Sequence, residues 1–200
     1  KKPLYIDVRG NLLTISKKIN SGEVSYITPQ TYEEITSICN NNGGILDPFE
    51  TIILDSITFL ERRLIRAITP KLDEEHPNVR NWGFMREKIF QLLTPLIDLA
   101  RNDEKDVILL GHERIIEADG KPPQGSIDIV GTLREQIPAM VDIILRTDFV
   151  SNKHVVRTVP HEGLWQCGVK SDLCKLDPMI PFTQDEGFEM ILSKVRGETK

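Results

Sequence analysis

The sequence has few cysteines and no long apolar run, and these shortages exclude several classes of protein. Three cysteines among 200 residues are too few, and odd in number, for a disulfide framework, so we expect a reducing compartment such as the cytoplasm. No apolar run approaches the roughly 20 residues that cross a membrane, and no signal peptide is recognisable. The closely spaced cysteine pairs of zinc sites are absent as well, which argues against a zinc-binding role.

The chain also has fewer positively charged than negatively charged side chains. The chain has 25 lysines and arginines against 30 aspartates and glutamates, a net charge of −5. Nucleic-acid binding would therefore need a local basic patch or an array of subunits. A hydrophobic content of 40% and 200 residues suit one globular domain with a substantial core. We expect a single domain over residues 1–200.

A short apolar run at Thr51–Asp55 is the clearest signal in the chain. Its β-branched and aliphatic residues predict a strand buried on both faces, followed at once by an amphipathic helix from Ile57. The strand ends in Asp55 and Ser56. At the carboxyl end of a parallel strand such side chains lie where open α/β sheets bind ligands, although both residues are also good helix caps. The six residues alone leave both interpretations open.

The remaining pattern alternates strands with helices and predicts a mainly parallel sheet with helices on both faces and an antiparallel C-terminal hairpin. The predicted strands are 4–8, 24–27, 106–112 and 141–146, with a hairpin of 154–159 and 163–167. The predicted helices are one capped at Thr28 and ending near 39, then 57–70, 82–101, 133–140 and 185–195. Residues 113–131, which are polar and rich in glycine and proline, predict a long loop that is either functional or disordered.

The order of these parts resembles the RecA-like P-loop ATPases. The closest likeness is to phage-encoded nucleotide-binding proteins related to the RecA and KaiC families, some of which are single-strand-annealing recombinases. It rests on the strand at Thr51–Asp55, Ile137-Pro138-Ala139-Met140-Val141-Asp142, Gly163-Leu164-Trp165-Gln166-Cys167-Gly168-Val169-Lys170, Leu176-Asp177-Pro178 and Pro181-Phe182. The resemblance covers nearly the whole chain. It implies a three-layer RecA-like fold that binds ATP and Mg²⁺.

Two features depart from that family. No segment fits the phosphate-binding pattern G-x-x-x-x-G-K-[ST]. Because the chain begins at Lys1, without methionine, and enters a strand at once, we expect the P-loop to lie in a missing N-terminal segment. The family often reads Asp-Thr-Glu in the first strand, where this chain reads Asp7-Val8-Arg9. Arginine stays protonated and cannot replace the glutamate as a general base.

The resemblance implies a role for several residues. Asp55 would hold the nucleotide's Mg²⁺, with Ser56 beside it and Asp7 nearby; Asp7 is alternatively a turn carboxylate. His112 would contact the γ-phosphate, or is a solvated histidine. Lys170 would reach a neighbouring subunit's nucleotide, or is a surface lysine. Glu61 or Glu113 would replace the missing base.

The polar stretch from Arg114 to Ser126 is placed like the DNA-binding loop of RecA-like recombinases. Arg114 and Lys121 would contact the phosphate backbone. The stretch has no aromatic residue on which bases could stack. DNA contact here would therefore depend on charge.

These implications predict a homo-oligomeric ATPase that binds nucleotide between its subunits. It would act on single-stranded DNA in phage-type recombination or annealing. If the protein is phage-encoded, it would be located in the host cytoplasm. Arg9 and the missing P-loop favour a rival: a degenerate RecA-fold subunit that serves as a scaffold in a replication or packaging complex. A DNA-independent switch of the KaiC sort is a third alternative, and a plain α/β domain without nucleotide is a fourth.

Overall fold

The computed structural model describes residues 2–10, 12–68, 79–102, 105–118, 120–160, 168–169, 176–181 and 187–195. The chain divides into two compact units, each with its own sheets. The first comprises Lys1–His112 and Ile127–Leu133, and the second Glu113–Ser126 and Arg134–Lys200. The α/β class is confirmed. That residues 1–200 form one domain stays a prediction.

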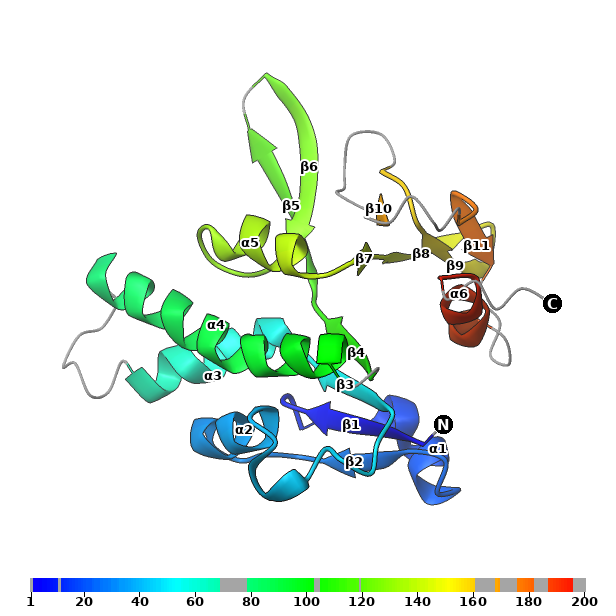
Figure 1. Ribbon diagram of the computed structural model, residues 1–200. Helices are drawn as coiled ribbons and strands as arrows, with labels where there is room; N and C mark the ends of the chain where they lie inside the picture. The colour runs from blue at the N-terminus through cyan, green and yellow to red at the C-terminus, as the bar shows by residue number, and fades with distance from the viewer. Residues whose placement is uncertain are drawn as a thin grey trace. The chain divides into compact units, whose positions relative to one another are not determined.

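A four-stranded parallel sheet forms the centre of the first unit, in the order β2-β1-β3-β4 (Figure 1). Its strands are β1 (Pro3–Asp7), β2 (Ser25–Ile27), β3 (Thr51–Asp55) and β4 (Asp106–Leu110). Leu4, Ile6, Ile52 and Leu54 are fully buried in the two central strands. The register places Asp7 opposite Asp55, and Asp55 opposite Leu110.

Helices flank this sheet: α1 (Ser16–Asn20), α2 (Tyr32–Cys39), α3 (Ile57–Ile68) and α4 (Val79–Asn102), with 3₁₀ turns η1 (Leu13–Ile15) and η2 (Asn42–Gly44). The chain moves one way along the sheet from β1 to β2 and the other way from β2 to β3 to β4. Parallel crossovers are right-handed as a rule, and this rule would put α1 on one face of the sheet and α2, α3 and α4 on the other. Contacts between α2, α3 and α4 agree with this placement.

Helix α2 begins later than the sequence pattern indicated. We expected a cap at Thr28 and Pro29 in the first turn, but the N-cap is Thr31, whose Oγ1 accepts a hydrogen bond from the backbone N–H of Glu34 at 3.1 Å. The Glu34 carboxylate in turn accepts from the backbone N–H of Gln30 at 2.6 Å. A threonine followed three residues later by glutamate is a capping-box pattern. It outweighs the preference of proline for a first turn.

The predicted loop between residues 113 and 131 is wrong for most of its length. β5 (Glu113–Ala118) and β6 (Lys121–Ile127) form a two-stranded sheet (Figure 1). Ile115 and Ile116 supply β-branched residues to β5. Gly120, at the turn, has a φ of +73°, which glycine adopts without strain. Because β6 contains two prolines, its composition predicted a loop and not a strand.

The rest of the second unit is built from short antiparallel strands and two helices. α5 (Leu133–Met140) leads to β7 (Ile143–Ile144), which pairs with β10 (Gly168–Val169). The three-stranded sheet has the order β11 (Met179–Pro181), β9 (Lys153–Arg157) and β8 (Arg146–Val150), and the described part of the chain ends with α6 (Gly187–Val195). Val156, Ile180 and Ile191 form its small core.

The antiparallel C-terminal strands are therefore confirmed, but their pairing differs from the prediction. β9 pairs on one side with β8, through a turn at Ser151 and Asn152, and on the other side with β11. Both turn residues have positive φ, as a tight hairpin turn requires. The predicted partner strand, residues 163–167, lies outside the described residues.

Candidate functional site

Two carboxylates meet at the carboxyl edge of the parallel sheet. Asp7 ends β1, Asp55 ends β3, and the strand register places them opposite each other. Asp7 is only 1% exposed. Its Oδ1 accepts hydrogen bonds from the backbone N–H groups of Arg9 and Gly10, at 2.9 and 2.8 Å. Its Oδ2 is buried and has no hydrogen-bond partner among the residues that the structure describes. Asp7 is thus a turn carboxylate, as one of the two interpretations predicted. Only its Oδ1 takes part in the turn.

The Asp55 carboxylate is oriented by a residue of the neighbouring strand. The hydroxyl of Tyr5 donates a hydrogen bond to Asp55 Oδ2. Burial of the phenol, followed by this hydrogen bond and by the negative charges of Asp55 and Asp7, raises the pKa of Tyr5 above its ordinary value. The backbone N–H of Val8 donates to the carbonyl of Asp55 at 2.7 Å, which continues the β1–β3 pairing past the last paired residue.

Ser56 is fully buried and caps helix α3. Its Oγ accepts a hydrogen bond from the backbone N–H of Phe59 at 3.3 Å, and the peptide bond that joins it to Asp55 is cis. One interpretation of the sequence had Asp55 cap this helix, but the hydrogen bond assigns that role to Ser56. A role of Ser56 beside the cofactor stays a prediction.

Glu61, one turn further along α3, is buried at 5% exposure. Its Oε1 accepts a hydrogen bond from the backbone N–H of Val130 at 2.8 Å. The carboxylate therefore ties the chain after β6 to α3. A structural role explains this burial without a catalytic one, and general-base activity of Glu61 stays a prediction.

His112 follows β4 and lies beside α3. Its backbone N–H donates to Thr58 Oγ1 at 3.1 Å, and its ring contacts Phe59 edge-on, with ring centroids 5.3 Å apart. The preceding residue, Gly111, lies close to Ile127: a Cβ at position 111 would lie 2.6 Å from Cδ1 of Ile127. The guanidinium groups of Arg9 and Arg62 also lie over the Phe59 ring. The Phe59 ring is thus in contact with one imidazole and two guanidinium groups.

The remaining predicted residues belong to the second unit. Arg114 is exposed on β5, and Lys121 begins β6, so both occupy a strand pair rather than a loop. Glu113, the second candidate for the base, forms an ion pair with Arg146 at 3.2 Å. Lys170 lies outside the described residues.

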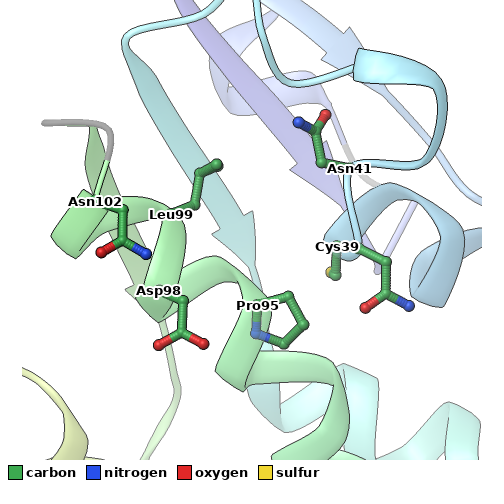
Figure 2. A pocket seen from close by; sticks show the side chains of 7 residues that line it. Cys39, Asn41, Pro95, Asp98, Leu99 and Asn102 are labelled. Carbon is green, nitrogen blue, oxygen red and sulfur yellow. The ribbon is translucent and has the colours of Figure 1, made fainter.

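A separate pocket of about 250 Å³ lies between the carboxyl ends of α2 and α4 (Figure 2). These helix ends lead into the amino ends of β3 and β4, so the pocket is at the sheet edge opposite Asp7 and Asp55. Cys39 lines it, and burial raises the pKa of that thiol to about 12. A thiol with so high a pKa is a poor nucleophile. We assign no chemistry to this pocket.

In the described parts of the chain, no group of three or more histidine, cysteine, aspartate or glutamate side chains is arranged to hold a metal ion by itself. A cation at Asp7 and Asp55 would therefore need ligands from elsewhere, such as phosphate oxygens and water. Mg²⁺ is commonly bound in this way, through one or two carboxylates. Among the described helices, none is both long and apolar enough to cross a membrane.

A parallel sheet with carboxylates at its carboxyl edge, followed by a capped helix, is an arrangement that P-loop nucleotide-binding ATPases share with other α/β proteins. The sequence model of one family in that class, described as AAA domain, matches residues 1–165. The chain belongs to this AAA-domain family, which confirms the broad prediction of a nucleotide-binding ATPase. No curated protein matches the chain.

Tyr5, Phe59 and Arg62 are site residues that the sequence interpretation missed. Tyr5 had a detectable signal, since residues two apart in a strand share a face and Asp7 was already a candidate. Phe59 had none, because an aromatic residue on an amphipathic helix predicts core packing. Only the fold brings Arg9, Arg62 and His112 to the same ring.

Proposed function

We propose that this chain binds Mg²⁺ and ATP at the carboxyl edge of β1 and β3. One observation carries the proposal: Asp7 lies in register with Asp55, and within the described structure its buried Oδ2 has no hydrogen-bond partner. Burying a carboxylate oxygen unpaired is costly unless a cation or donor compensates it. Hard oxygen ligands suit Mg²⁺, which would neutralise charge on the nucleotide phosphates.

We further propose that the protein, with ATP bound, binds single-stranded DNA in recombination or annealing. The support is the family resemblance of the sequence, together with the exposed position of Arg114 on the β5–β6 strand pair. The binding would rely on backbone phosphates and be sensitive to salt. Assembly into a homo-oligomer with nucleotide between subunits would array these cations along a strand and offset the net charge of −5.

The scaffold alternative has its own supporting observation. Arg9 occupies the place where the resembling proteins carry a catalytic glutamate, and its guanidinium lies over Phe59. A chain of this kind would bind nucleotide weakly or not at all, would not hydrolyse it, and would serve as a scaffold. The KaiC-like switch differs in that its turnover would ignore DNA.

The deciding experiment is Mg²⁺-dependent ATP hydrolysis by the full-length protein, with and without single-stranded DNA. Asp55→Ala removes the proposed metal ligand, and Asp98→Ala, an exposed carboxylate beside the pocket at the opposite sheet edge, is the matched control. Turnover that DNA stimulates and that only Asp55→Ala abolishes supports the proposal. Turnover indifferent to DNA supports the switch. Absence of turnover in a protein with an intact P-loop supports the scaffold, and turnover that survives Asp55→Ala means that the site is misplaced.

A further inference from the structure

Phe59 is the centre of a cationic cluster at the carboxyl edge of the first unit's sheet. The Cζ atoms of Arg9 and Arg62 each lie 5.1 Å from the centroid of its ring. The His112 ring meets Phe59 edge-on, with an interplanar angle of 75°. Guanidinium groups at this distance from a ring face are held by cation–π attraction. The cluster therefore concentrates cations at the edge that also carries Asp7 and Asp55.

The two arginines differ in how their charge is balanced. Arg62 forms an ion pair with Asp128 at 3.1 Å. Within the described parts of the chain, no carboxylate lies at ion-pair distance from the Arg9 guanidinium. Arg9 is exposed, so its charge is available to an anion from solution. Among the described residues, Arg9 is thus the one of the pair without a carboxylate partner.

Contacts hold both the backbone and the guanidinium group of Arg9. Its backbone N–H donates to the buried Asp7 carboxylate at 2.9 Å, and its guanidinium lies over Phe59. A side chain that is already ordered loses less conformational entropy when it binds a ligand. The planar guanidinium fork matches phosphate oxygens in a way that a lysine ammonium does not. This arrangement suits an anion-binding residue and is unsuited to proton abstraction.

We propose that Arg9 binds a phosphate group of the bound nucleotide and that Phe59 positions it to do so. The proposal rests on the proposed function, because it takes the nucleotide to lie at Asp7 and Asp55. Arg9 comes only two residues after Asp7, so a cation at Asp7 and the Arg9 guanidinium would act on the same phosphates from neighbouring positions. The arginine in this strand would then be a substitute phosphate ligand rather than a defect.

The test is an equilibrium titration of the full-length protein with a fluorescent ATP analogue and Mg²⁺. Arg9→Ala should weaken binding about tenfold, the typical worth of one charge-assisted hydrogen bond. Arg9→Lys should recover part of the loss, because it restores the charge without the fork. Phe59→Leu should weaken binding less than Arg9→Ala does. Arg66→Ala, an exposed arginine one turn beyond Arg62, is the matched control and should bind as the wild type does.

The outcomes separate this inference from the proposed function. If the wild type binds, Asp55→Ala does not, and Arg9→Ala binds like the wild type, the inference is overturned while the proposed function stands. If the wild type and Asp55→Ala are equally unable to bind, both are overturned. A parallel titration with single-stranded oligonucleotide in the absence of nucleotide tests the other source of phosphate. If Arg9→Ala weakens only that binding, the assignment to the nucleotide is overturned.

Discussion

The hydroxyl of Tyr5 donates a hydrogen bond to the carboxylate of Asp55, across the β1–β3 pair. Tyr5 lies opposite Ile53 in this register, so the contact is a diagonal one along the same face of the sheet. It fixes one oxygen of the residue that we propose as a metal ligand. Partners of this kind orient a ligand and tune its affinity for metal.

Replacement of Tyr5 by phenylalanine should therefore weaken Mg²⁺–nucleotide binding while preserving the ring. We also expect a change in pH dependence. The pKa of Tyr5 is raised in the folded protein, so the folded state holds this proton more tightly than the unfolded state does. The associated stability is fully present below the ordinary tyrosine pKa of about 10 and is lost as pH rises above it.

The measurement is the free energy of unfolding in urea between about pH 8 and pH 11. Wild type should lose more stability over this range than Tyr5→Phe. Tyr26→Phe, at a half-exposed tyrosine, is the control and should follow the wild type. Parallel curves for wild type and Tyr5→Phe would contradict the prediction.

Asp7 makes two separable contributions, one to the turn and one to the proposed cation. Asp7→Ala removes the acceptor for the N–H groups of Arg9 and Gly10 and should lower the free energy of unfolding by about 2–4 kcal/mol. Asp7→Asn retains an acceptor oxygen and should cost less than half as much. Both variants should lose the stabilisation that Mg²⁺ and ATP confer on the wild type.

Urea unfolding of each Asp7 variant, with and without Mg²⁺ and ATP, measures both effects. Full ligand stabilisation in Asp7→Asn would show that Asp7 serves the turn alone. Equal destabilisation by asparagine and alanine would show that the two backbone hydrogen bonds do not account for its contribution.

Glu61 tests whether a buried acid is structural or catalytic. Glu61→Gln keeps an oxygen for the Val130 N–H, so its stability should lie within about 1 kcal/mol of the wild type, whereas Glu61→Ala should cost about 2–3 kcal/mol. If Glu61 is only structural, Glu61→Gln retains the wild-type turnover. A loss of turnover of 100-fold or more, with stability intact, would instead be the result expected of a general base.

The cap of α2 gives a local test of the fold. Thr31→Ala removes the hydroxyl that accepts from Glu34 and should cost about 1 kcal/mol. Thr28→Ala, at the position that the sequence pattern favoured, should change stability by less than about 0.5 kcal/mol. Thermal unfolding of both variants checks the assignment. A larger effect at Thr28 would contradict it.

The boundaries that the sequence predicted best are those with a strong apolar pattern. The strands at Leu4 and Thr51 and the helix ending near Arg101 lie within a few residues of their predicted bounds. The errors fall where patterns compete or are weak. Thr28 and Thr31 are both good caps, and the two prolines of β6 masked a strand that pairing with β5 stabilises.

The sequence by itself determined the α/β class, the buried parallel strands and the acids that end them, because apolar periodicity and strand-end polarity are local properties. Only the tertiary structure decided which side chains meet. The Tyr5–Asp55 hydrogen bond, the burial of Asp7 and the contact of Arg9 with Phe59 depend on strand register and helix placement. Strand register and helix placement arise from burial of the whole core. The local sequence around a residue therefore carries no signal of the distant residues that it will contact.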